Sequence, residues 1–382
     1  MTTDTLIEKR PVVMVDVIGQ YRKYQEEIDS AILDVVRSGA YINGPAVKSL
    51  EREMQEYLGV KHAIGCASGT DALQLALMAM DLGAGDEVIT TPFTFVATTE
   101  TIALLGGVPV YVDIDPHTFN IDASRIEERI TPRTRAIIPV HLFGQPSDMT
   151  AIGAIAKKHN LIVIEDAAQA VGATWHDKRV CGLGDMATLS FYPSKNLGAF
   201  GDAGMVTTND DALAAKLRSI ANHGSAQTYH HDKLGVNSRL DSIQAAILRV
   251  KLQYLDEWNA RRNEVAKLYT QHFSFYSDTV TTPTIADGAT HIWHQYSVII
   301  NADREKVMSS LKNIGIPTSI YYPIPLHRQE AYQQYGGKQG DYPLAEYAAK
   351  HILALPMHSE LSDDDVAYIA ENVISVINQF PR

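Results

Sequence analysis

Short apolar runs alternate with stretches of helical periodicity through the first half of this chain, from residue 63 to about residue 208. The apolar runs are residues 63–66, 87–90, 108–112, 136–140, 161–164, 187–191 and 204–207, and the helical stretches between them include 71–81, 98–105, 123–129 and 149–159. This alternation is typical of a mostly parallel sheet covered by helices on both faces. We therefore predict an α/β fold whose ligands bind at the carboxyl ends of the strands.

The remainder of the chain predicts a second, smaller unit, since 382 residues exceed one small domain. Helical patterns precede the alternating region at 21–38 and 46–58, and a long one follows it from 238 to about 273. Strand-like 294–300, helix-like 304–314, strand-like 318–321 and a helical end complete the pattern. The prediction is an N-terminal arm with a large α/β domain over residues 1–250, and a smaller α+β domain over 251–382.

Composition excludes several classes of partner. The 33 basic and 45 acidic residues give a formal net charge of −12, which argues against binding to nucleic acid or to anionic membranes. Cys66 and Cys181 stand far apart without a CxxC pair, so we expect neither a disulfide framework nor a metal site. The polar N-terminus and the absence of any run of membrane-spanning length predict a cytoplasmic protein.

An acid and a lysine each follow a predicted strand. Asp166 comes directly after the apolar run 161–164, and Lys195 lies on a Ser-, Pro- and Gly-containing loop after the run that ends at 189–191. Asp166 alone could cap a helix, and Lys195 alone could serve an ion pair. Together at strand ends they match the needs of pyridoxal phosphate (PLP), whose aldehyde a lysine holds as a Schiff base and whose ring nitrogen an acid keeps protonated.

Two further strand ends fit the same cofactor. Residues 67–71, Ala-Ser-Gly-Thr-Asp, follow the first run and open a helix, where free backbone N–H groups bind a phosphate. Ser68 or Thr70 could instead be an ordinary N-cap. Residues 91–98 carry two aromatic side chains between a strand and a helix, and an aromatic ring there can stack on a flat cofactor or pack in the core.

Two later motifs are rich in hydrogen-bonding side chains. Tyr229, His230 and His231 form either a solvated loop or a polar surface for a charged ligand, and no third ligand stands at a metal-binding spacing. Residues 321–327, Tyr-Tyr-Pro-Ile-Pro-Leu-His, end a predicted strand with two prolines, which favours a rigid loop that faces a site.

Taken together, these motifs resemble the DegT/DnrJ/StrS family of PLP-dependent sugar-nucleotide aminotransferases, over about residues 13–375. The motifs that carry the resemblance are residues 44–45, 68–70, 91–95, 165–169, 190–198, 201–202, 209–210 and 237–239. The resemblance implies the aspartate-aminotransferase fold, called fold type I.

The resemblance also assigns roles in the cofactor site. Lys195 would hold PLP and move protons, Asp166 would pair with the ring nitrogen, and Gln169 would lie beside the ring oxygen. Phe95 would stack on the ring. The phosphate would be bound by Gly69, Thr70, Ser190 and, from a partner subunit, Asn237. The implied protein is a homodimer with shared active sites.

Within the family, several segments resemble enzymes that aminate the sugar 3-position. The implied reaction moves an amino group from L-glutamate to a nucleotide-linked 3-oxo sugar, in making amino sugars for surface polysaccharide. A UDP-2-acetamido-3-oxo sugar, the glucuronate included, is favoured over a dTDP-3-oxo-6-deoxyhexose or a 4-oxo sugar. The candidate substrate-binding residues are Tyr229, His230, His231, Arg239, Tyr321, Tyr322 and His327. Lys195 argues against the related dehydratases, which carry histidine there, and the intact site argues against a non-catalytic regulator.

Overall fold

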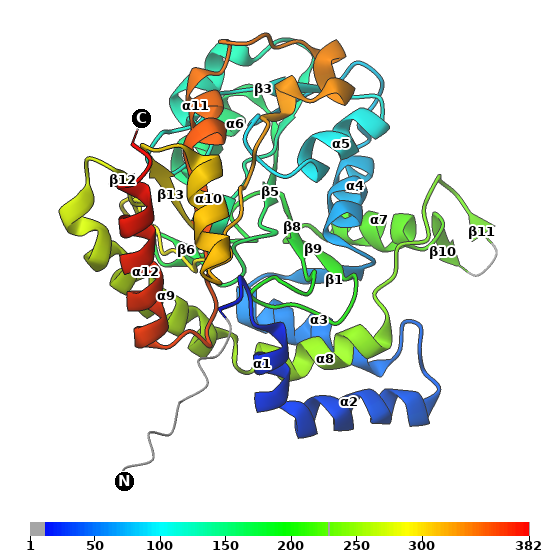
Figure 1. Ribbon diagram of the computed structural model, residues 1–382. Helices are drawn as coiled ribbons and strands as arrows, with labels where there is room; N and C mark the ends of the chain where they lie inside the picture. Colours follow the sequence, from blue (N-terminus) through cyan, green and yellow to red (C-terminus); the bar gives the residue numbers. More distant parts are fainter. Residues whose placement is uncertain (1–11, 228–229, 382) are drawn as a thin grey trace.

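The computed structural model describes residues 12–227 and 230–381, and its centre is a seven-stranded sheet in the order β1-β9-β8-β5-β4-β2-β3 (Figure 1). The strands are β1 (His62–Cys66), β2 (Glu87–Thr90), β3 (Val108–Tyr111), β4 (Thr134–Ile137), β5 (Ile162–Asp166), β8 (Met186–Ser190) and β9 (Gly204–Thr208). Strand β9 runs antiparallel to both neighbours, and the other pairings are parallel. The predicted α/β fold with a mostly parallel sheet is confirmed.

Helices cover both faces of this sheet because neighbouring apolar residues on each strand point to opposite sides. Val88 packs in one core with helices α4 (Gly69–Ala79) and α7 (Asp211–Ala221). Ile89 packs in another core with α6 (Met149–His159). Helix α5 (Ala97–Leu104) follows β2. The predicted helix at 123–129 is two 3₁₀ helices, η1 (Ala123–Arg125) and η2 (Glu127–Arg129).

Two long helices predicted from periodicity are each broken in the structure. The pattern at 21–38 divides into α1 (Val17–Lys23) and α2 (Gln25–Ser38), because Tyr24 has φ −121° and ψ 22°. The pattern at 238–273 begins with extended backbone at Asp241, which pairs with Ile42. It then forms α8 (Ser242–Leu252) and α9 (Leu255–Phe273). The break lets α8 pack against α2 and α3 (Pro45–Leu58), while α9 continues into the C-terminal part (Figure 1).

The C-terminal part is built on a small antiparallel sheet of β12 (Val280–Thr281), β13 (Tyr296–Ile300) and β14 (Ile352–Leu355). Helices α9, α10 (Arg304–Asn313) and α12 (Asp363–Ile377) pack on it in one core, and α11 (Pro343–His351) leads into β14. The predicted strand at 318–321 is wrong. Only Ser319 pairs, with Ala354, as an isolated bridge beside β14.

The remaining elements are short. They are two hairpins, β6 (Thr174–Trp175) with β7 (Lys178–Arg179) and β10 (Ser225–Gln227) with β11 (His230–His231), and the 3₁₀ helices η3 (Leu142–Gly144), η4 (Ser274–Tyr276), η5 (Leu326–Arg328) and η6 (Glu330–Tyr335). Among the described residues, no helix combines the length and apolarity that crossing a bilayer requires. The division into domains at residue 250 stays a prediction.

Candidate active site

A cavity of about 560 Å³ opens where the carboxyl ends of the parallel strands meet the C-terminal part. Its lining residues are Ser68, Gly69, Thr70, Leu73, Thr94, Phe95, Ala97, Val140, Asp166, Ala168, Gln169, Ser190, Tyr192, Ser194, Lys195, Asp202, Ala203, His294, Gln295, Tyr321 and Tyr322. The sheet contributes the turns after β1, β2, β5 and β8, and the C-terminal part contributes residues 294–295 and 321–322. Residues far apart in sequence therefore share one site.

Lys195 lies on the loop that follows β8, with its backbone N–H bonded to the Tyr192 carbonyl at 2.8 Å. Side chains of α8 hold this loop, because Lys251 Nζ donates to the Gly198 carbonyl and Gln244 Oε1 accepts from the Phe200 N–H. Burial lowers the pKa of Lys195 to about 8, and the charge of Asp166 opposes that shift. About a tenth of the amine is therefore neutral, and nucleophilic, at pH 7, and about half at pH 8.

Asp166 ends β5 and is only 5% exposed. Its Oδ2 accepts a hydrogen bond from Thr98 Oγ1 at 2.8 Å, and its Oδ1 accepts one from the Ala168 N–H at 3.2 Å. Burial raises the pKa of this carboxyl, while the two hydrogen bonds and the charge of Lys195 oppose the rise. The carboxyl is thus held in place at the cavity wall, where a cationic ring nitrogen would stabilise its charged form.

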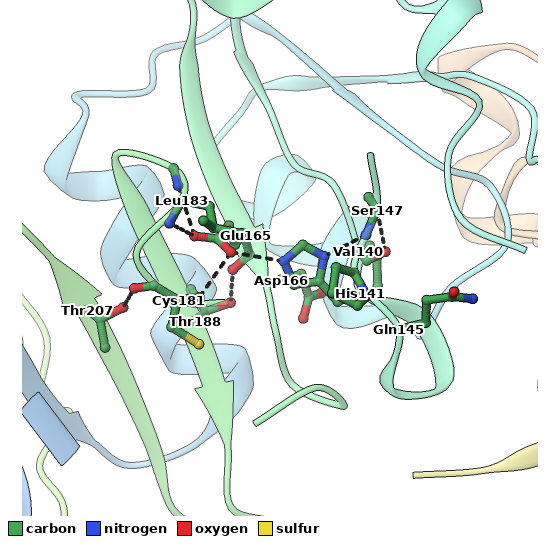
Figure 2. Close-up of polar contacts among 12 residues, drawn as sticks. Val140, His141, Gln145, Ser147, Glu165, Asp166, Cys181, Leu183, Thr188 and Thr207 are labelled. Carbon is green, nitrogen blue, oxygen red and sulfur yellow. Dashed lines mark hydrogen bonds and ion pairs between the residues drawn. The ribbon is translucent and has the colours of Figure 1, made fainter. Parts of the chain in front are cut away.

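Glu165, one residue earlier, points away from the cavity into a buried network (Figure 2). Its carboxylate accepts from the N–H groups of Cys181, Leu183 and Gly184, and His141 Nε2 lies 3.0 Å from it. His141 Nδ1 accepts from the Ser147 N–H, so its proton resides on Nε2 and is donated to Glu165. The network fixes the end of β5, and alternation along the strand turns Asp166 the opposite way.

The turn from β1 into α4 has the features of a phosphate site. Ser68 caps α4, since its Oγ accepts from the Asp71 N–H at 3.1 Å. A Cβ added to Gly69 would lie 2.5 Å from Ser190 Cβ, so the bare backbone lets Ser190 approach the helix N-terminus. Thr70 lines the same cavity. Backbone N–H groups and hydroxyls on these residues fit a phosphate.

Aromatic side chains also line the cavity. Phe95 is 55% exposed and its ring lies 6.2 Å from that of Tyr322, whereas Phe93 is fully buried in the core. Gln169 joins this group, because its Nε2 donates to Tyr322 Oη at 3.1 Å and its Oε1 accepts from the Phe143 N–H. Phe95 therefore presents a free aromatic face to the cavity.

Other predicted site residues do not line the cavity. Asn237, His230 and His231 are exposed and Arg239 is half-buried, although Ser238 Oγ accepts from the N–H of Ala67, beside the α4 turn. Tyr229 lies outside the described residues. His327 is buried elsewhere, with Nε2 at 3.0 Å from Glu346 and its ring against Tyr342. Sequence reasoning missed Thr98 and His294, whose contacts depend on the fold.

Chemical labelling tests the state of Lys195. In the apoprotein, we expect acylation of Lys195 to rise with pH, reach half its maximum near pH 8 and then level off, since only the neutral amine reacts. A free lysine peptide serves as the reference and should keep gaining reactivity towards pH ~10.4. Peptide mass spectrometry measures Lys195 and the reference, and a Lys195 profile that follows the reference would contradict the burial argument.

Comparison with known proteins agrees with this geometry. The model of the DegT/DnrJ/EryC1/StrS aminotransferase family matches residues 22–374. The chain is 49% identical to a "Pleiotropic regulatory protein" of Geobacillus stearothermophilus, covering 97% of this chain and 99% of the relative. It is 47% identical to the "UDP-2-acetamido-2-deoxy-3-oxo-D-glucuronate aminotransferase" of Pseudomonas aeruginosa, covering 94% and 98%.

A solved structure is similar over the same extent. The crystal structure of S. venezuelae DesV in complex with a ketimine intermediate superposes with a TM-score of 0.93 at 39% identity, and covers 96% of this chain and 98% of that one. Fold, cavity and sequence therefore agree: the chain belongs to the DegT/DnrJ/EryC1/StrS aminotransferase family.

Proposed function

We propose that this protein is a PLP-dependent aminotransferase that moves an amino group from L-glutamate to a nucleotide-linked 3-oxo sugar. The observation that carries the proposal is that Lys195, Asp166 and the N-terminus of α4 line the same cavity. An amine that loses its proton easily, a buried acid and a phosphate site are the three attachments that PLP requires.

The residues of the cavity fit PLP. Lys195 would hold its aldehyde carbon, and Gly69, Thr70 and Ser190 would bind its phosphate. Asp166 would keep the proton on the ring nitrogen. When bound, PLP supplies an electron sink for the carbon that gains or loses the amino group.

The protein side chains would then orient the reactants and move protons. Thr98 holds the Asp166 carboxylate in one orientation by its hydrogen bond. Lys195, with a pKa lowered to about 8, can take up and return a proton at its Nζ in the working pH range. Phe95 would cover one face of the ring, and Gln169 would stay fixed beside it through Phe143 and Tyr322.

The walls of the cavity suit a sugar as the acceptor. Hydroxyl groups of serine, threonine and tyrosine line it, and such groups can exchange hydrogen bonds with the hydroxyls of a sugar. The relative from Pseudomonas aeruginosa supports a UDP-2-acetamido-3-oxo sugar as acceptor. A dTDP-3-oxo-6-deoxyhexose is the second candidate.

We further propose a homodimer with shared active sites. In the single chain, Phe95 and Tyr192 at the cavity are 55% and 56% exposed, so its mouth is open to a partner. Asn237 is exposed and does not line the active-site cavity formed by the described residues of its own chain. A second copy that closes the mouth would let Asn237 reach the phosphate and let Arg239, His230 and His231 approach the sugar nucleotide.

Reverse transamination tests the function directly, because 3-oxo sugars are unstable. With 2-oxoglutarate as acceptor, we expect glutamate from 3-amino sugar nucleotides and none from 4-amino ones. Lys195→Ala should abolish glutamate formation, and Asp166→Asn should slow it by orders of magnitude, while Lys157→Ala on the exposed face of α6 should match wild type. Glutamate from 4-amino compounds alone would refute the regiochemistry, and glutamate from no sugar nucleotide would refute the function.

Subunit mixing tests the shared site. If Asn237 acts in trans, a hybrid of Lys195→Ala with Asn237→Ala contains one site with both lesions and one with neither. Mixing the two inactive proteins should therefore restore part of the wild-type activity. Subunit exchange is verified by mass, and an absence of recovery between two severely impaired variants would count against the shared site.

A further inference from the structure

His294 lies in the cavity wall beside Lys195, on the segment that leads into β13. His294 is 7% exposed, and its ring is close enough to Lys195 for the lysine charge to act on it. Its Nδ1 lies 3.3 Å from Oδ1 of Asn196, the residue that follows Lys195. The hydrogen bonds of this ring determine what it can do.

A chain of hydrogen bonds with fixed directions places the ring proton of His294 on Nδ1. The Val171 carbonyl accepts from Asn259 Nδ2, so Asn259 Oδ1 is free to accept from Asn196 Nδ2 at 2.8 Å. Asn196 Nδ2 also donates to the Ile292 carbonyl at 2.9 Å. Asn196 must therefore turn its oxygen to His294, and His294 Nδ1 must carry a hydrogen to donate to it.

The other nitrogen of His294 is consequently a bare acceptor. Burial, together with the charges of Lys195 and Arg262, holds the pKa of the ring well below its usual value, so the ring is neutral and Nε2 carries a lone pair. No donor of the described chain bonds to Nε2, not even Lys195 nearby. His294 lines the cavity, and its Nε2 is not among the fully enclosed, unpaired polar atoms of the described residues.

We propose that His294 is a specificity residue, whose Nε2 accepts a hydrogen bond from an O–H or N–H group on a sugar carbon next to the one that is aminated. The inference rests on the proposed function. In a 2-acetamido-3-oxo sugar, the donors that flank the reacting carbon are the C4 hydroxyl and the C2 amide N–H. A bare acceptor selects for such a donor, because a sugar without it leaves Nε2 unpaired.

A cycle of variants and substrates tests this pairing. The reverse reaction is run with UDP-2-acetamido-3-amino-2,3-dideoxyglucose and with its analogues that lack the C4 hydroxyl or the C2 acetamido group. For wild type, we expect kcat/KM to fall roughly tenfold with one analogue, about the value of one hydrogen bond. His294→Asn keeps a donor for Asn196 but removes Nε2, so it should lose a similar factor with the parent sugar and show no further loss with that analogue.

Two further variants separate this role from a structural one. His291 is also buried and neutral, but it stacks on Trp293 and lies outside the cavity wall, so His291→Asn should keep the wild-type ratio between substrates. His294→Gln can turn an amide oxygen to the ligand, so it should recover part of the wild-type ratio of kcat/KM between the parent sugar and that analogue. PLP absorbance reports folding of each variant.

The outcomes distinguish the two claims. Equal use of all three sugars by wild type, or an unchanged ratio in His294→Asn, would overturn the role of His294 while leaving the aminotransferase intact. No glutamate from any sugar nucleotide with wild type would overturn the proposed function and this inference with it.

Discussion

The site depends on bringing a buried carboxylate and a buried amine to one edge of a sheet. Burial alone acts on both groups in the neutralising direction, since it raises the pKa of Asp166 and lowers that of Lys195. Each charge opposes the shift of the other, so each group helps its partner to keep its charge. The parallel arrangement of β5 and β8 makes this possible, because both strands deliver their carboxyl ends to the same edge.

The geometry is held by hydrogen bonds that lie away from the cavity. Glu165 and His141 fix the end of β5 from the opposite face, and the strand period then points Asp166 into the cavity. On the other side, Asn196 fastens the lysine loop to Asn259 of α9 and to the segment before β13. The position of Lys195 is thereby tied to the C-terminal part, which also supplies His294 to the cavity wall.

Sequence patterns predicted the local structure better than its interruptions. Strands in the large sheet were located to within a few residues, because apolar runs of strand length are bounded by turn residues. The helical region predicted over 238–273 is divided into α8 and α9, since periodicity does not register a local change of backbone angle such as that at Tyr254. For the site, Lys195 and Asp166 were found from their places at strand ends. His294 and Thr98 were not, because nothing local distinguishes a cavity residue from a core one.

The central claim is that Lys195, among all lysines, holds the cofactor. Lys251 is the natural rival, since burial lowers its pKa to about 8 as well, although it lies outside the cavity wall. The direct measurement is reduction of the PLP-loaded protein with borohydride, followed by peptide mapping. A phosphopyridoxyl group on Lys195 alone is the result that the structure predicts, and a group on Lys251 or any other lysine would contradict it.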